Sequence, residues 1–214
     1  AAGAPGAMQG GAAAPPSRRW WDDALRFAER CLDARRSALV ESTHPDLIPT
    51  LLLLGRAHAK LKDRESAMAR YGEALAVQRA ALGDVHPDVA DALLSLCRVQ
   101  DDPADAVDSA SEAVRILRSV FGDDHPRTVE ALCRLGSAHS RRSAAPVGGG
   151  GAAAATRSRS EAISCYEEAL ALRRSALGED PMGPACGDAL YRMGMLHRAG
   201  EDYGRAAGCL EEVL

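Results

Sequence analysis

Apolar residues along most of this chain recur every three or four positions, which places them on one face of an α-helix. Between residues 51 and 74 this pattern describes two helices separated by a polar turn at residues 60–65. The positions that define the two faces are Leu51, Leu54, Gly55 and His58 in the first helix, and Ala67, Tyr71 and Ala74 in the second. The small residues among them allow the helices to approach closely, so the pattern predicts an antiparallel helix pair.

The same pattern recurs along the chain at nearly regular intervals. Four prolines each stand ten residues before the small residue of an apolar helical run. These prolines are Pro45, Pro87, Pro126 and Pro184, and the small residues are Gly55, Cys97, Gly136 and Gly194. Such a repeat predicts a solenoid in which each helix pair buries its apolar face only against its neighbours. The expected fold class is all-α, a right-handed superhelical solenoid of antiparallel helix pairs.

Each junction between units combines a helix-ending signal with a helix-starting one. Glycine follows the last apolar residue at Leu82, Phe121 and Leu177, and glycine most easily adopts the left-handed conformation that ends a helix. The proline that follows fits the first turn of a helix, where its missing N–H costs no hydrogen bond. Units are therefore expected to begin at residues 44, 86, 125 and 183, after a half unit over residues 19–43.

Two segments depart from this rhythm. Residues 1–18 consist mainly of Ala, Gly and Pro and are expected to be disordered, because they offer little apolar surface to bury. Residues 143–158 interrupt the third unit with a run of glycines followed by a run of alanines. They are expected to form a disordered loop between the two helices of that unit, although the alanines can also extend the next helix backward. The repeat array as a whole is expected over residues 19–214.

The helix pair resembles the tetratricopeptide repeat, whose large-Leu-Gly-Tyr and Ala-Phe-Ala signatures fall at these intervals. The 42-residue unit and its Leu-Gly-x-x-His-Pro junction resemble the repeats of kinesin light chains and nephrocystin-like proteins. The resemblance implies a non-catalytic protein–protein interaction module, a scaffold or adaptor that binds a peptide or helix of a partner in its concave groove. An alternative is the regulatory or assembly flank of a larger multidomain enzyme or signalling protein. A third is a structural spacer that self-associates through uncapped apolar ends.

In such an array the first helix of each unit lines the groove, and aligning the units gives the residues that face it. The peptide-binding candidates are Leu52, Arg56 and Lys60 in the first unit, Asp91, Leu94 and Arg98 in the second, Glu130, Arg134 and Arg141 in the third, and Asp188, Tyr191, Met195 and Arg198 in the fourth. These helices lack the paired asparagines with which kinesin light chains hold cargo, and the asparagines of a chaperone-binding carboxylate clamp. Neither kind of recognition is therefore expected.

The residues that most often carry chemistry fall into structural positions. Three histidines lie at the junctions and three in the first helices, which predicts helix restarts and helix packing rather than catalysis. These are His44, His86 and His125, and His58, His139 and His197, respectively. The six cysteines are scattered without the spacing of a metal site and are expected to be reduced thiols. No catalytic residue, cofactor or metal is expected, and the chain is predicted not to be an enzyme.

Charge and hydropathy argue against two classes of partner. The chain has 26 basic and 30 acidic residues, a formal net charge of −4, and so lacks the basic excess typical of nucleic-acid-binding proteins. No run of about 18 or more apolar residues occurs, so no membrane partner is expected. The expected location is the cytoplasm, and the family resemblance adds the cytoskeleton and the cilium.

Overall fold

The computed structural model describes residues 18–39, 44–145, 151–177 and 184–212, and every regular element within these ranges is helical. The α-helices are α1 (Arg18–Ala38), α2 (Ile48–Leu61), α3 (Arg64–Leu82), α4 (Pro87–Val99), α5 (Pro103–Phe121), α6 (Pro126–Ala144), α7 (Gly151–Leu177), α8 (Pro184–Ala199) and α9 (Tyr203–Glu211), with a short 3-10 helix, η1 (Pro45–Leu47), before α2. The predicted terminal segment, residues 1–18, lies outside the described residues except for Arg18, which begins α1.

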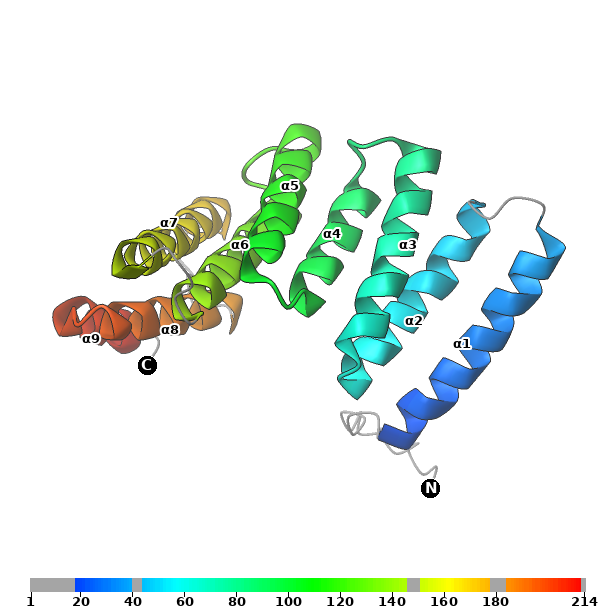
Figure 1. Ribbon diagram of the computed structural model, residues 1–214. Helices are drawn as coiled ribbons and strands as arrows, with labels where there is room; N and C mark the ends of the chain where they lie inside the picture. The colour runs from blue at the N-terminus through cyan, green and yellow to red at the C-terminus, as the bar shows by residue number, and fades with distance from the viewer. Residues whose placement is uncertain (1–17, 40–43, 146–150, 178–183, 213–214) are drawn as a thin grey trace, which may run out of the picture.

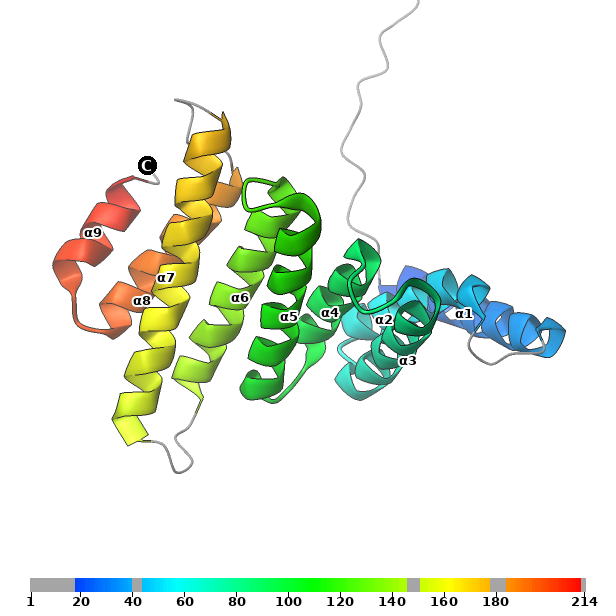
Figure 2. The ribbon, with the colours of Figure 1, turned by 90° about the horizontal axis from the view of Figure 1, so that it is seen from above.

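The helices form a curved row in which each packs mainly against the next (Figure 1). The antiparallel pairs are α2 with α3, α4 with α5, α6 with α7, and α8 with α9, and α1 packs against α2 at one end of the row. Seen from above, the row turns along its length (Figure 2). The helices therefore form an open solenoid, in which contacts link neighbours rather than distant parts of the chain.

Small apolar clusters between neighbouring helices take the place of a single central core. In the first pair, Gly55 of α2 lies against the ring of Tyr71 of α3, and Tyr71 also belongs to a cluster with Val99 of the next unit. The same glycine position contacts Tyr166 in the third pair and Leu210 in the fourth. In the second pair, Cys97 takes the place of the glycine and Ala110 takes the place of the tyrosine, and both belong to one cluster. Each pair therefore joins a small residue to a larger one, which allows close helix packing.

The junctions are built by glycine and histidine together. Gly83 and Gly122 end α3 and α5 with φ angles of 82° and 86°, which favour glycine. The ring nitrogen Nδ1 of His44, His86 and His125 then accepts a hydrogen bond from the backbone N–H two residues later, at 3.2, 3.1 and 3.2 Å respectively. The junction histidines are thus N-caps, which satisfy an N–H that the first helical turn leaves without a partner.

A row of ion pairs joins the second helices of successive units. The pairs are Arg36 with Glu73, Arg79 with Glu112, Arg118 with Glu168, and Arg174 with Glu212, and we call them the outer ion pairs. Each arginine stands three residues before a large apolar residue at the end of its helix or, for Arg36, just past it. The first three glutamates each directly precede a buried alanine. The outer ion pairs therefore occupy equivalent positions throughout the array.

The interruption of the third unit differs from the loop expected over residues 143–158. Helix α6 continues to Ala144 and α7 begins at Gly151, so most of this segment is helical. Alanine is the best helix former, and the alanine run extends α7 backward. Arg142 of α6 also donates a hydrogen bond to the buried Ser158 hydroxyl at 2.8 Å, which fixes the extension against α6. Residues 146–150 lie outside the described residues.

Candidate functional site

Three adjoining pockets open on the first helices of consecutive units. The first pocket, about 380 Å³, lies between α2, α3 and α4. The central pocket, about 330 Å³, lies between α2, α4 and α6. The third pocket, about 400 Å³, lies between α6, α7 and α8. Arg56, Asp91 and Ser95 line both the first and the central pocket, and Arg127, Glu130 and Arg134 line both the central and the third. The three pockets are therefore continuous, and we call them together the groove.

The first pocket combines an apolar wall with an unused hydrogen-bond acceptor. Ile48, Pro49 and Leu52 of α2 form its wall, and Tyr71 and Gln78 reach it from α3. Gln78 is only 3% exposed, and its side-chain oxygen accepts no hydrogen bond within the described residues. A buried carbonyl oxygen in this state can accept an N–H from the backbone of a bound peptide.

The central pocket holds two arginines that form no ion pair within the described ranges, Arg56 of α2 and Arg98 of α4. Between them lie Leu94 and Ser95 of α4. Burial raises the pKa of the nearby Tyr71 hydroxyl, and the positive charges of Arg98 and Arg56 oppose this rise. Both guanidinium groups are therefore close enough to the groove wall to act on a buried group, and both can bind a negative charge.

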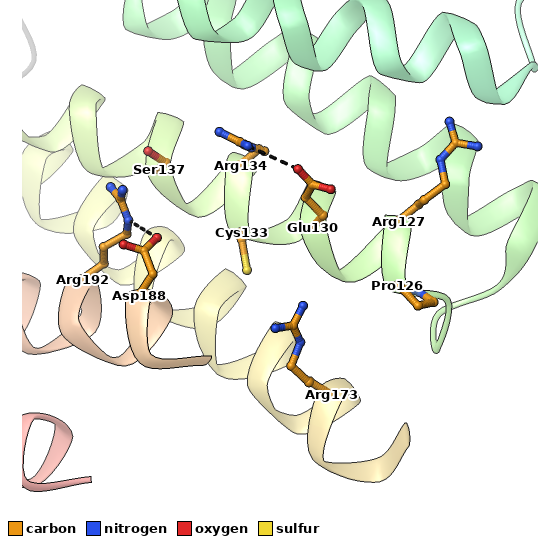
Figure 3. Close-up of a pocket in the computed structure, with 9 residues that line it drawn as sticks. All are labelled: Pro126, Arg127, Glu130, Cys133, Arg134, Ser137, Arg173, Asp188 and Arg192. Carbon is orange, nitrogen blue, oxygen red and sulfur yellow. Dashed lines mark hydrogen bonds and ion pairs between the residues drawn. The ribbon is translucent and has the colours of Figure 1, made fainter. Parts of the chain in front are cut away.

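Four arginines and two carboxylates line the third pocket, as many of each as line the central pocket. Figure 3 shows Arg134 beside Glu130 on α6, Arg192 beside Asp188 on α8, and Arg173 extending from α7. The first two pairs are ion pairs one helical turn apart, at 3.2 and 2.8 Å. The Cys133 thiol lies among these groups, and Ser137 stands at the far end (Figure 3).

Arg127 is held on two sides at the boundary between the central and third pockets. Its guanidinium pairs with Asp91 of α4 and lies 5.3 Å from the centre of the Phe121 ring. Burial raises the pKa of the Asp91 carboxyl, and Arg127 opposes that rise. This ion pair links the first helices of two units across the groove floor.

The groove carries the opposite charge to the chain as a whole. Six arginines and four carboxylates line it, a net of two positive charges, whereas the whole chain has a formal net charge of −4. The arginines are Arg56, Arg98, Arg127, Arg134, Arg173 and Arg192, and the carboxylates are those of Asp88, Asp91, Glu130 and Asp188. Concentrating positive charge in a concave surface favours a negatively charged partner.

Eight of the thirteen candidates from the sequence line these pockets. They are Leu52, Arg56, Asp91, Leu94, Arg98, Glu130, Arg134 and Asp188. The remaining five line none of the three, and of these Lys60, Tyr191 and Arg198 are exposed on α2 or α8 whereas Met195 is half-buried. Arg141 has a different role from the one expected, because it donates hydrogen bonds to the carbonyls of Cys97 (2.7 Å) and Gln100 (3.2 Å) at the end of α4. It anchors two units to each other.

Sequence reasoning missed several groove residues. Arg173 and Gln78 lie on second helices, which the alignment of first helices left out. Ser95 and Arg192 each stand two residues before the small residue of their unit, a position that could have revealed them. Arg127 directly follows a junction proline and was not among the residues predicted to face the groove.

The first-helix histidines pack within their own units. His58, His139 and His197 are at most 9% exposed, and each ring nitrogen Nδ1 lies near a carboxylate. The distances are 3.1 Å to Asp63, 3.1 Å to Glu161 and 4.0 Å to Asp202. Within the described part of the chain, no cluster of three or more His, Cys, Asp or Glu side chains could hold a metal ion. No helix in the described ranges is long and apolar enough to cross a membrane.

Burial makes two of the cysteines poor nucleophiles. It raises the pKa of the Cys165 thiol to about 11, and neighbouring glutamates add to the rise. Burial also raises the pKa of Cys97, which nearby arginines only partly oppose. Both groups therefore remain protonated at neutral pH, whereas a reactive cysteine needs its thiolate form.

Comparison with known proteins identifies the repeats. The sequence profile of the tetratricopeptide repeat family matches residues 50–88 and 150–181. A search of curated protein sequences gave no match. The first match covers the helix pair α2 and α3, and the second covers α7, so the prediction of tetratricopeptide repeats is confirmed for these segments.

Solved structures confirm the solenoid fold. BtubC (BKLC) from P. vanneervenii is 20% identical with a TM-score of 0.72, over 90% of this chain and 71% of that one. The nearly identical TPR-like repeats of a putative kinesin light chain from Podospora anserina are 19% identical in two structures, with TM-scores of 0.73 and 0.72. The similarity covers 91% of this chain in both, and 85% and 86% of those chains. MamA is 16% identical with a TM-score of 0.59, over 92% of this chain and 88% of that one. The likeness to these proteins shows the all-α solenoid of helix pairs.

Proposed function

We propose that this tetratricopeptide repeat chain is a non-catalytic interaction module that binds an extended, acidic segment of a partner protein in its groove. Tetratricopeptide repeats generally mediate protein–protein interactions, which supports a protein partner. The observation that carries the proposal is the pair of arginines in the central pocket, Arg56 and Arg98, which form no ion pair within the described residues. In a chain with an excess of acidic residues, such cations favour carboxylates from another molecule.

The dimensions of the groove fit an extended peptide. The groove crosses four first helices, α2, α4, α6 and α8. Packed helices lie about 8–10 Å apart, and successive first helices are separated by at least this distance. The groove therefore spans at least about 25 Å, the length of roughly eight or more extended residues. Alternate side chains of such a peptide face the groove, where the apolar wall at Leu52 and the arginines offer different contacts.

Charge reversal in the groove tests this function. We expect Arg98→Glu and Arg134→Glu each to weaken binding of a fluorescein-labelled Glu-Gly repeat peptide by about tenfold, because each replaces an attraction with a repulsion. Fluorescence anisotropy at two salt concentrations measures the affinity, and binding should weaken as the salt concentration rises. Affinity capture from the source organism with the same variants then identifies the natural partner.

The control is Arg30→Glu, which makes the same charge change on an exposed position of α1 outside the three pockets. It should bind the peptide like the unchanged protein. Circular dichroism and thermal unfolding test whether all three variants are folded. Arg98→Gln replaces a groove variant that does not fold. Equal binding of Glu-Gly and Lys-Gly peptides, or equal loss in the groove variants and in Arg30→Glu, would contradict the proposal.

A further inference from the structure

The third pocket and the first pocket are equivalent pockets in two different units. Each lies between the two helices of one unit and the first helix of the next. Aligning the second helices at Tyr71 and Tyr166 places Arg173 at the position of Gln78, and aligning the first helices at Cys97 and Gly194 places Arg192 at the position of Ser95. The third pocket therefore has two arginines where the first pocket has an amide and a hydroxyl.

With these two, four arginines line the third pocket. Arg127 and Arg134 contribute from α6, Arg173 from α7 and Arg192 from α8 (Figure 3). The pocket is also lined by the carboxylates of Glu130 and Asp188, so its lining residues carry a net of two positive charges, although Arg127 is paired with Asp91 of the adjoining pocket. Each carboxylate pairs with an arginine one turn away on its own helix, so it orients that guanidinium without using all five of its N–H donors.

A buried hydroxyl without a hydrogen bond in the described part of the chain lies behind this pocket, next to two of the residues that line it. Tyr166 of α7 is 1% exposed, and its hydroxyl forms no hydrogen bond within the described residues. Ser137 and Arg192, which both line the pocket, lie close to it without the geometry of a hydrogen bond. Burial raises the pKa of this hydroxyl to about 12, so it keeps its proton at neutral pH and can donate it in a hydrogen bond.

We propose that the third pocket binds the phosphate group of a phosphorylated serine or threonine in the segment that occupies the groove. A phosphomonoester carries a charge of about −1.5 to −2 at neutral pH, which balances the net charge of the pocket. Its tetrahedral oxygens can accept hydrogen bonds from several arginines on different helices at once, whereas a planar carboxylate is matched by a single guanidinium. The pocket shares three residues with the central pocket, so a peptide in the groove can reach it.

This inference rests on the proposed function, because it assigns one subsite of the same groove. Its test uses N-acetyl-O-phosphoserine amide as the probe and follows the 31P NMR signal during titration with the protein. Two variants introduce the residues that the first pocket already uses, Arg192→Ser and Arg173→Gln. We expect each to weaken probe binding by about tenfold, since each removes a charge-assisted contact. Arg30→Ser on α1 is the control and should leave binding unchanged.

Inorganic phosphate and N-acetylglutamate amide serve as competitors in the same titration. Both should displace the probe only at concentrations far above the dissociation constant of the probe itself. Equally strong displacement by inorganic phosphate would assign the pocket to a free anion, and equally strong displacement by the glutamate compound would assign it to carboxylates. Each of these two displacement results would overturn the proposal. Equal binding of the probe by all variants, or no binding to the unchanged protein, would also overturn it. Retained binding of the Glu-Gly peptide in those cases would leave the proposed function intact.

Discussion

Gly55 of α2 lies directly against the ring of Tyr71 of α3. A Cβ atom at Gly55 would stand 2.6 Å from Cε1 of that ring, closer than real Cβ atoms come to their neighbours. The ring is 5% exposed and is packed against the next unit as well, so it has little room to move. This one contact sets how closely the two helices of the first pair approach.

Adding a methyl group at Gly55 should therefore destabilise the protein. We expect Gly55→Ala to lower the free energy of unfolding by about 1–3 kcal/mol, the usual cost of overpacking. Gly72 of α3 is a matched control, because a Cβ atom there meets nothing within 4 Å. Gly72→Ala should raise stability by about 0.5–1 kcal/mol, since alanine favours helix over glycine. Urea unfolding of both variants measures the difference, and equal effects would contradict the packing argument.

Removing a junction cap should also cost stability. His86→Ala leaves the N–H of Asp88 without its acceptor at the start of α4 and should lower the free energy of unfolding by about 1 kcal/mol. His86→Asn keeps a side-chain acceptor and should recover most of the loss. Thermal unfolding of the two variants compares them. If asparagine and alanine are equally harmful, the histidine contributes through its ring rather than through the cap.

The outer ion pairs should contribute modestly and in a salt-dependent way. Arg79 Nη2 lies 2.7 Å from Glu112 Oε2, and both side chains are about one-third exposed, at 37% and 32%. A double-mutant cycle with Arg79→Gln and Glu112→Gln should give a coupling energy of about 0.2–1 kcal/mol at low salt. This coupling should shrink in about 1 M salt because the charges are screened. A coupling of zero, or one that salt does not change, would refute an electrostatic link between units.

Acidification should destabilise the third unit through His139. Burial lowers the pKa of His139 below its ordinary value of 6.5, and Glu161 only partly opposes this. The unfolded chain therefore binds a proton more readily than the folded one, so stability is lost as the pH falls below 6.5. Urea unfolding at pH 7 and pH 5 should show a smaller loss in His139→Gln than in the unchanged protein. An NMR titration that gave His139 a pKa above 6.5 would contradict this.

The sequence predicted the parts of the groove that depend on position within a unit. Leu52, Asp91 and Glu130 face the groove because each lies on the open side of its first helix, and helical periodicity is enough to place them. The same periodicity placed Gly55 and Tyr71 on the apolar faces of the two helices. These features need only the pairing of helices within one unit, which short turns impose.

Features that depend on contacts between units could not be predicted in this way. The position of Arg173 in the third pocket, and the reach of Arg141 to the end of α4, follow from the angle and offset between successive pairs. That geometry arises from many small packing contacts, which a single sequence does not specify. The start of α7 was ambiguous for another reason, because glycine and alanine runs favour opposite outcomes and alanine prevailed from residue 152 onward.

The outer ion pairs give the array a direction. Helices α3, α5 and α7 each carry a glutamate for the preceding helix and an arginine for the following one. At the position equivalent to that glutamate, α1 carries Arg30 instead. A unit copied from α4 and α5 can thus be placed next to itself with every pair intact, whereas a helix placed before α1 needs an acidic side chain to meet Arg30. Longer grooves can therefore be built by inserting further copies of the chain's own units at positions that follow α1 in the array.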